Sequence, residues 1–485
     1  MIKKPTLLQL AYALLLGALT FGFVACSESD DVDDPNEQTT PEEETNPDPT
    51  PDPEEEEEEE DNTPVPGDPS WSATITAQEY FGHVMKNFFY DLKYSQGAIS
   101  SASIAEEMFV DDDMNGVRIS IFGNDDKPAH PAAGEVIESY YTGTFTSITN
   151  ARAARGTKEF IVFASKKLNG KTSFPDWVKD DAGEVDPEPY SRLLFDYIEF
   201  MDSKGVTIDV LGVDNEIEYN EGNITPQKYY ETVNFLKARL AEAGLPIPKF
   251  IGPERYGANA AWIKTFFESG YDDTMDIYGN HYYPTQRFTR YNDFVSDMTY
   301  IGDREFWATE PHWNAESTTT GADVLGYAES AIGAIWDHTD MGLDAIMWWD
   351  YKRTTNTRAY LMRTISAPIK DAQPVRVVDH DGESIRTNGL LHTRAFREGN
   401  QITLYIVNTC AEEDVASQPS YTNYEFVLAD ATCSSYKIAY TQWRDDTEIS
   451  GADDYTIIYN KNKFFLDIPA RSITYVTFKV SDVTE

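Results

Sequence analysis

Cysteine, histidine and basic residues are scarce in this chain of 485 residues. It contains 3 Cys, 7 His and 39 Lys and Arg, against 83 Asp and Glu. The few Cys and His do not follow the spacing of a metal cluster, so we expect neither a metal nor another cofactor. The net charge of −44 argues against nucleic acid as a partner.

A long apolar run occurs only near the N-terminus. Lys3 and Lys4 precede LLQLAYALLLGALTFGFVA at 7–25, and Cys26 follows directly. This order is typical of a bacterial lipoprotein signal, so we expect residues 1–25 to be removed and Cys26 to carry the lipid. An ordinary cleaved signal or an N-terminal membrane anchor is the alternative. No later stretch is long and apolar enough to span a bilayer.

Residues 26–69 are predicted to be a disordered acidic tether. Residues 27–69 hold 20 Asp and Glu and no Lys or Arg, with EEEEEEED at 54–61. Such a segment repels itself and buries no apolar surface. SESDDVDD, directly after Cys26, resembles the export signal of surface-exposed lipoproteins of the Bacteroidota. We therefore expect a monomer held at the outside of the outer membrane by a lipid anchor.

Apolar strand patterns alternate with helical patterns over residues 70–385. Seven runs fit buried strands, and PQKYYETVNFLKARLAEAG at 226–244 fits a helix that ends on glycine. The seven runs are 117–123, 159–165, 206–213, 248–254, 275–281, 304–310 and 344–350. We place the first of eight strands within TITAQEYFG at 74–82. The pattern predicts an α/β fold, a (β/α)8 TIM barrel.

The pattern changes near residue 385. Closely spaced strand-like segments such as QITLYIVNT and SITYVTFKV follow with no helix between them. Residues 386–485 are therefore predicted to form an additional antiparallel β-sandwich domain. Cys410 and Cys433 lie in this part, and in an exported protein they could form one disulfide.

Polar and aromatic residues gather where the predicted barrel strands end. Asn215-Glu216 follows the fourth strand, His281-Tyr282-Tyr283 the sixth, and Thr309-Glu310 the seventh. In such barrels the carboxyl ends of the strands form the active site. Two carboxylates that face each other across this opening are what cleavage of a glycosidic bond requires.

In these motifs the chain resembles the retaining (β/α)8 glycosidases, and in detail glycoside hydrolase family 30. The resemblance runs from about residue 75 to the C-terminus. It is carried by FASKKLNGKTSFPDWVK, DNEIEYNEGNITPQKYYE, HYYP, FWATE, AIMWWDYKR and IPARSITYVTF. It implies a barrel with a β-sandwich and a double-displacement hydrolase of β-linked polysaccharide.

The resemblance also implies roles for individual residues. Glu216 would be the acid/base and Glu310 the nucleophile. Asn215 would bind the 2-hydroxyl of the sugar, Tyr283 would orient Glu310, and His281 would line the site. The remaining implied roles are electrostatic support of the nucleophile by Arg118 and stacking on sugars by Trp177, Trp348 and Trp349. Trp349 could instead be buried, since neighbouring strand residues face opposite ways.

One departure limits how far the resemblance extends. The family usually has Pro after the acid/base glutamate, and this chain has Ile217. The loop that follows could therefore take another path, and we do not transfer the substrate. Glu218 and Glu221 on that loop are interpreted as solvated acids.

Several functions remain open from the sequence. The substrate could be xylan, β-1,6-glucan or β-1,6-galactan, cut in endo or exo mode, and the tryptophans favour endo action on a polymer. Lys352 and Arg353 could bind a uronic acid branch or form surface ion pairs. The alternatives are an agarase- or porphyranase-like galactanase of a sister family, or a surface glycan-binding lipoprotein without catalysis.

The lipid anchor gives a first test. Cys26→Ala is expected to abolish membrane attachment, because no other segment of the sequence can anchor the chain. Cell fractionation measures this directly. Recovery of the variant in the membrane fraction would contradict an anchor at Cys26.

Overall fold

A computed structural model describes most of the chain after residue 70. The described residues are 71–93, 95–122, 129–166, 174–216, 224–256, 260–282, 297–311, 339, 342–348, 363–364, 366–380, 382–383, 391–408, 419–444, 447–448 and 454–483. All statements below concern these residues.

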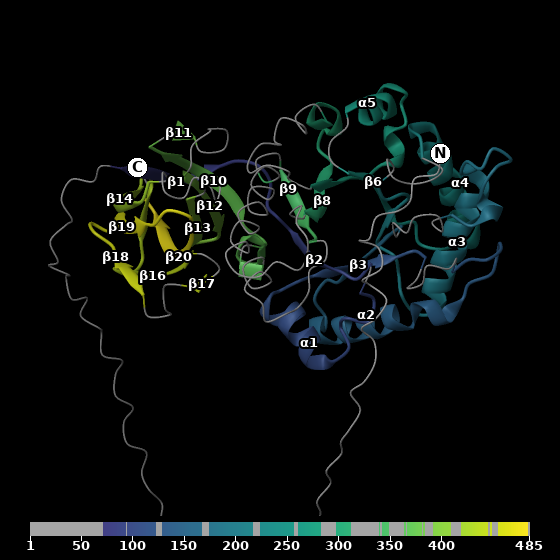
Figure 1. Ribbon diagram of the computed structural model, residues 1–485, viewed down its shortest axis with the longest axis horizontal. Coiled ribbons are helices and arrows are strands. Elements are labelled where there is room, and N and C mark those ends of the chain that lie inside the picture. Colours follow the sequence, from purple (N-terminus) through teal and green to yellow (C-terminus); the bar gives the residue numbers. More distant parts are fainter. Residues whose placement is uncertain are drawn as a thin grey trace, which may run out of the picture. The chain divides into compact units, whose positions relative to one another are not determined.

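Eight parallel strands close into a barrel, β2 to β9 in chain order (Figure 1). They are β2 (Asn87–Asp91), β3 (Gly116–Ser120), β4 (Ile161–Ser165), β5 (Val210–Gly212), β6 (Lys249–Tyr256), β7 (Ile277–Tyr282), β8 (Glu305–Pro311) and β9 (Leu343–Ile346). The last seven strands confirm the runs predicted from the sequence. Every neighbouring pair is parallel, so all carboxyl ends lie at one opening.

Helices connect the barrel strands in the described part of the chain. They are α1 (Ala102–Glu106), α2 (Thr142–Arg155), α3 (Pro187–Ser203), α4 (Pro226–Ala243) and α5 (Ala260–Glu268). Short helical turns occur at η1 (Glu107–Asp111), η2 (Glu138–Tyr141), η4 (Asp176–Val178), η5 (Asp272–Thr274) and η6 (Ala367–Ile369). None of these helices is long and apolar enough to cross a membrane.

Local sequence explains the limits of α4. The Thr225 side chain accepts a hydrogen bond from the Lys228 amide, and Pro226 occupies the first turn, where its missing N–H has no cost. The helix ends at Gly244, whose φ of 67° is left-handed. The predicted helix at 226–244 is therefore confirmed.

The predicted position of the first barrel strand is wrong. Residues 74–82 fall largely in β1 (Ser72–Tyr80), which pairs with β10 (Gln373–Asp379) and β14 (Tyr421–Leu428) in the second sheet and not with the barrel. The first barrel strand is β2, with sequence NFFYD. β1 has an alternating pattern suited to a sheet with one exposed face, whereas β2 is buried throughout, as a strand enclosed by helices must be.

The second sheet has 12 strands and contains the predicted sandwich strands. They are β1, β10 (Gln373–Asp379), β11 (Gly382–Glu383), β12 (Leu391–Glu398), β13 (Gln401–Asn408), β14 (Tyr421–Leu428), β15 (Ala431–Cys433), β16 (Lys437–Arg444), β17 (Thr447–Glu448), β18 (Tyr455–Ile457), β19 (Lys463–Ile468) and β20 (Ser472–Asp482). Because β1 and β10 belong to it, this sheet recruits residues from both ends of the predicted barrel segment. The pairing of β1 with β14 is parallel, and the sheet is otherwise antiparallel.

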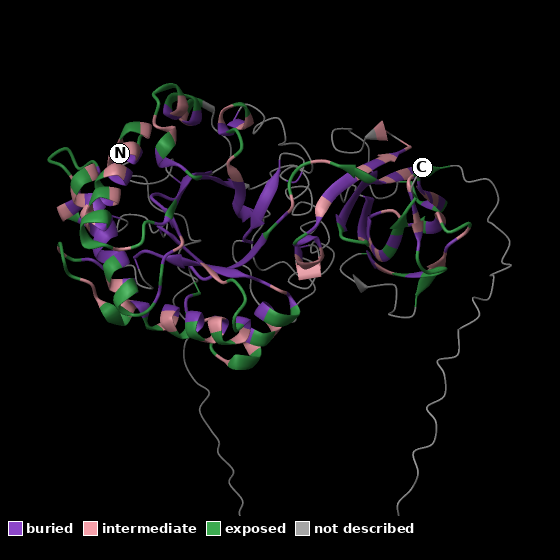
Figure 2. Cartoon of the chain, turned by 180° about the vertical axis from the view of Figure 1, so that it is seen from behind, coloured by how far each residue is buried: buried purple, intermediate pink, exposed green. Residues whose placement is uncertain are grey.

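The barrel strands are mostly buried, whereas the surrounding helices have one buried and one exposed face (Figure 2). Inside it, Phe89, Phe163 and Trp307 belong to one apolar cluster. A larger cluster joins the outward-facing strand residues to the helices and includes Phe396 and Trp443 of the second sheet. The same core thus continues from the barrel into the sandwich.

Cys433 is buried and has no disulfide partner among the described residues, and burial raises the pKa of its thiol to about 12. It packs in the apolar core of the sandwich. Its proposed disulfide partner, Cys410, lies outside the described residues.

Gly116 provides a test of packing inside the barrel. A Cβ at this position would lie 2.4 Å from the Phe89 ring and 2.7 Å from the Ile161 carbonyl oxygen. Gly116→Ala is expected to lower the free energy of unfolding by about 1–3 kcal/mol through overpacking. Denaturant unfolding measures the change. Gly97→Ala is the control, since its nearest neighbouring atom would be 3.9 Å away, and an equal loss there would contradict this explanation.

Candidate active site

The carboxyl ends of the barrel strands bring the predicted polar residues together. Asn215 and Glu216 lie three and four residues after the end of β5, His281 lies on β7, and Glu310 lies on β8. Arg118 reaches the same place from β3. All five side chains are buried. The grouping predicted from the sequence is therefore present in the structure.

An irregularity in β8 directs Glu310 toward the site. Trp307 belongs to the cluster inside the barrel and Ala308 to the cluster outside it. Regular alternation would then place residue 310 outside as well. The register between β7 and β8 shifts by one residue after the Asn280–Ala308 pair, so that His281 pairs with Glu310. An extra residue of this kind re-aims the side chains that follow it.

Glu310 is held as an anion by three neighbours. Its Oε1 lies 2.7 Å from Lys93 Nζ and 2.7 Å from Arg118 Nη1. Its Oε2 lies 3.3 Å from His281 Nδ1. Burial opposes ionisation, but electrostatic interaction with His281, Lys93 and Arg118 outweighs it and holds the pKa of Glu310 well below its usual range. This carboxylate is suited to act as a nucleophile.

Arg118 ties several strands together through hydrogen bonds. Its guanidinium donates to the Thr309 carbonyl at 2.7 Å and to Asn215 Oδ1 at 2.8 Å. It also pairs with Asp91 at 3.3 Å and with Glu254 at 3.2 Å. Burial would lower the pKa of Arg118, but these carboxylates and Glu310 raise it instead, so the group stays charged.

Glu216 contacts the same histidine as Glu310. Its Oε1 lies 3.0 Å from His281 Nδ1. Its backbone amide donates to the Glu254 carbonyl at 2.7 Å. Glu216 and Glu254 have φ angles of 52° and 49°, which side-chain-bearing residues rarely adopt. Such strain costs on the order of 1–3 kcal/mol per residue and is common where a backbone positions functional groups.

Glu254 fills space that a glycine leaves open. A Cβ on Gly212 would lie 2.0 Å from Glu254 Oε2, so only glycine is compatible with this side-chain position. The Ser165 hydroxyl donates to the carboxylate at 3.1 Å. Burial raises the pKa of Glu254, although Arg118 and Lys93 oppose the shift.

The segment that follows β5 is fixed by a buried ion pair. Lys166 Nζ lies 3.0 Å from Asp214 Oδ1, and the same oxygen accepts the Asn215 amide at 2.8 Å. Burial lowers the pKa of Lys166, whereas Asp214 opposes the shift. Because Asp214 directly precedes Asn215, this pair restrains the backbone that presents Asn215 and Glu216.

Three residues of the site were missed in the sequence: Asp91, Lys93 and Glu254. Asp91 is the last residue of the true first strand and Lys93 follows it, so both were missed when that strand was assigned wrongly. The signal was the run NFFYDLK, a buried strand that ends in two charged residues. Glu254 ends the predicted run PKFIGPE, but nothing in that run distinguished it from a solvated acid.

The tryptophans predicted to bind sugars differ in environment. Trp348 is fully buried and donates its indole N–H to Ser366 Oγ at 2.6 Å. A fully buried indole cannot stack on a sugar, so the prediction for Trp348 is wrong. It belongs to the cluster outside the barrel, because it alternates with the inward-facing Met347.

Trp177 is half-buried on η4, and its indole donates to the His130 carbonyl at 2.9 Å. Its role in sugar binding stays a prediction. Tyr283, Trp349, Lys352 and Arg353 lie outside the described residues, as does Cys26.

The site also contains atoms that could bind a metal ion. One atom each from Glu216, His281 and Glu310 lie within 4.8 Å of one another. However, Lys93 and Arg118 both contact Glu310 and would repel a cation. The donor set therefore fits a metal ion poorly.

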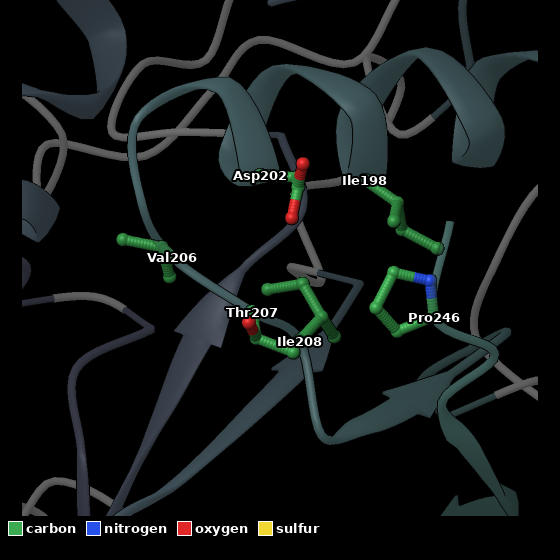
Figure 3. Close-up of a pocket in the computed structure, with 6 residues that line it drawn as sticks. All are labelled: Ile198, Asp202, Val206, Thr207, Ile208 and Pro246. Carbon is green, nitrogen blue, oxygen red and sulfur yellow. The ribbon is translucent and has the colours of Figure 1, made fainter. Parts of the chain in front are cut away.

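A pocket lies elsewhere on the barrel (Figure 3). Its lining residues are Ile198, Asp202, Val206, Thr207, Ile208 and Pro246. They precede β5 and β6 in the chain, whereas Asn215 and Glu216 follow β5. The pocket thus lies at the opposite end of the strands.

Comparison with known proteins agrees with this fold. No protein-family model matches the sequence. Glucuronoxylanase XynC of Bacillus subtilis is 23% identical over 315 residues, which cover 60% of this chain and 66% of the relative. The chain thus spans just under two thirds of the length of the curated relatives it matches.

Solved structures extend the comparison over more of the chain. A family 30 endoxylanase from Clostridium papyrosolvens C71 matches with a TM-score of 0.59 and 18% identity, covering 84% of this chain and 100% of that one. An endo-β-1,6-glucanase matches with a TM-score of 0.55 and 14% identity, over 84% and 94%. The chain therefore has the barrel-and-sandwich fold of glycoside hydrolase family 30. The predicted fold class and the resemblance to that family in fold are confirmed.

The buried ion network gives a stability test. Arg118→Met is expected to lower the free energy of unfolding by about 3–5 kcal/mol, because it leaves buried carboxylates without their cation. Arg376→Met removes an exposed pair with Glu79 at 3.0 Å, and its expected cost is about 1 kcal/mol or less. Denaturant unfolding compares the two variants, and equal losses would contradict the assigned role of Arg118.

Proposed function

We propose that this protein is a retaining glycoside hydrolase that cleaves a β-linked polysaccharide. The observation that carries the proposal is the pair Glu216 and Glu310, of which one carboxylate oxygen each lie within 4.8 Å at the carboxyl ends of the strands. Retaining enzymes hold their two carboxyl groups about 5–5.5 Å apart, whereas inverting enzymes need about 6.5–9.5 Å to admit a water. The short separation therefore favours retention.

In the first step Glu310 attacks the anomeric carbon and forms a glycosyl ester. The bond from that carbon to the leaving oxygen breaks, and Glu216 gives its proton to this oxygen. In the second step Glu216 takes a proton from water, the water oxygen bonds to the anomeric carbon, and the ester bond breaks. Both carboxyl groups then return to their starting states.

The surroundings of the two glutamates support this division of roles. A nucleophile has to be ionised, and the lowered pKa of Glu310 provides that. Two cations contact Glu310 at 2.7 Å, and the Glu216 carboxylate lies 3.0 Å from His281. Asn215 precedes Glu216 and is suited to bind the 2-hydroxyl of the sugar.

Xylan is the substrate that the comparisons favour. Curated relatives are glucuronoxylanases, and solved neighbours include xylanases and an endo-β-1,6-glucanase. We infer endo action at the cell surface, with Cys26 as the lipid anchor and residues 26–69 as the tether. A β-1,6-glucan or galactan would be cut by the same chemistry.

Incubation of the purified protein with a panel of polysaccharides tests the proposal. Chromatography of the products identifies the glycan and separates endo from exo cleavage. Proton NMR of the first product is expected to show the retained anomer. Binding of a glycan without any product would instead favour a non-catalytic surface protein, and an inverted anomer would exclude double displacement.

Variants of the two glutamates test their separate roles. Glu216→Ala and Glu310→Ala are each expected to lower cleavage of the natural glycan by several orders of magnitude without unfolding the protein. An aryl glycoside with an activated leaving group needs little protonation, so Glu216→Ala retains its first step on that substrate. Added azide is expected to speed this variant only, because a small anion can enter the space of the missing base. If azide instead sped up Glu310→Ala, Glu310 would be the acid/base and Glu216 the nucleophile.

A further inference from the structure

Lys93 is a buried residue that was not predicted from the sequence. It contacts Glu310, the proposed nucleophile, and Asn215, the proposed ligand of the sugar 2-hydroxyl. Lys93 follows β2, and its side chain is fully buried. Its ammonium lies 2.7 Å from Glu310 Oε1 and donates to Asn215 Oδ1. Its backbone amide donates to Asp91 Oδ1 at 2.8 Å, which restrains the chain at this point. The ammonium thus connects the nucleophile to the residue that precedes the acid/base.

Arg118 makes a parallel pair of contacts. Its Nη1 lies 2.7 Å from Glu310 Oε1, and its Nη2 donates to Asn215 Oδ1 at 2.8 Å. Two cations therefore engage the same two oxygens. Because both groups are donors only, they require the oxygen of the Asn215 amide on their side. The amide nitrogen, a donor, is consequently directed away from them, as binding of a sugar hydroxyl requires.

We propose that Lys93 is a positioning residue that fixes Glu310 Oε1 and the Asn215 amide together, so that Glu310 Oε2 is the oxygen that attacks. The inference rests on the proposed function. Oε2 forms the bond to the anomeric carbon while the glycosidic bond breaks and Glu216 protonates the leaving oxygen. Oε1 becomes the carbonyl oxygen of the ester and keeps its contacts with Lys93 and Arg118.

The same contacts assist the second step. When the ester bond breaks, its electron pair returns to the Glu310 carboxylate, while Glu216 takes the proton from the attacking water. Negative charge therefore reappears beside two fixed cations. Preorganised charges of this kind act most strongly where charge develops during the reaction.

The positive charge of Arg118 is shared among three carboxylates, so it does not stabilise the Glu310 anion exclusively. It contacts Asp91 at 3.3 Å and Glu254 at 3.2 Å as well as Glu310. Burial raises the pKa of Asp91 and of Glu254, although Arg118 and Lys93 oppose both shifts. Among the described residues, the Lys93 ammonium forms its ion pair with Glu310, at 2.7 Å. Lys93 thus supplies a charge directed at the nucleophile.

Lys93→Met is expected to lower kcat by about 100-fold to 1000-fold, the usual effect of removing one preorganised donor. The acid limb of the pH–rate profile should also move to higher pH. Removing a cation makes the Glu310 anion less favourable, so a higher pH is needed to ionise it. His281, Glu216, Arg118, Asp91 and Glu254 also face this cluster and remain in the variant.

Two further variants separate charge from shape. Lys93→Gln keeps a hydrogen-bond donor without the charge, and its acid limb should move as in Lys93→Met. Lys93→Arg keeps the charge, so its acid limb should stay near that of the wild type even if kcat falls. Lys370→Met is the matched control, because Lys370 is a buried lysine paired with Asp113 at 2.7 Å outside the site. It should lose stability but leave kcat and the acid limb unchanged.

A substrate-free measurement separates this inference from the proposed function. The Glu310 carboxyl is observed by NMR in protein labelled with ¹³C at the glutamate carboxyls, and Glu310→Gln assigns its signal. In Lys93→Met, or in Lys93→Gln if the first variant does not fold, the signal should titrate at higher pH than in the wild type. The shift in titration is expected even if the protein cleaves no polysaccharide. A failure to cleave would overturn the proposed hydrolase function and leave the role of Lys93 intact.

A wild-type titration in both folded Lys93 variants would overturn the role of Lys93. A normal acid limb in Lys93→Gln together with a displaced one in Lys93→Arg would do so as well, because shape and not charge would then control the nucleophile.

Discussion

The negative charge of Glu310 has to be kept inside the barrel, and much of the site follows from that need. A carboxylate without partners in such a place would take up a proton. Lys93 and Arg118 contact one oxygen at 2.7 Å each, and His281 lies 3.3 Å from the other. These groups come from the region of β2, from β3 and from β7, so one anion links three parts of the barrel to β8.

Arg118, one of the cations that stabilise the Glu310 anion, is itself paired with other buried carboxyl groups. Arg118 also pairs with Asp91 and Glu254, and both carboxyl groups have raised pKa values because they are buried. Gly212 provides the space for Glu254, and the Glu254 carbonyl in turn accepts the amide of Glu216. Glu216 and Glu310 are therefore connected through a continuous set of charged and hydrogen-bonded groups. A change to one member is expected to affect the others.

The sequence predicted most of the barrel because its strands are short apolar runs between helical patterns. It failed at the first strand, which was predicted within TITAQEYFG and lies at NFFYD. Both are apolar enough for a strand, and only tertiary pairing assigns the former to the second sheet. The error also hid Lys93, since the residues that follow a barrel strand are recognised only when the strand is. The net charge did not indicate the buried cations of the site either, because a few Lys and Arg side chains hardly change the charge of so acidic a chain.

Side-chain direction was harder to predict than strand position, and the reason is local. Regular alternation correctly accounts for Trp348, which faces outward next to the inward-facing Met347. The same rule would have turned Glu310 away from the site, but the register shift between β7 and β8 reverses it. Glu216 depends on a left-handed backbone, with φ of 52°.

Both glutamates thus occupy irregular positions. The regular barrel determines where the two carboxylates lie along the strands, and the irregularities determine where they point. Sequence patterns that rely on a regular period can therefore predict the first property and not the second.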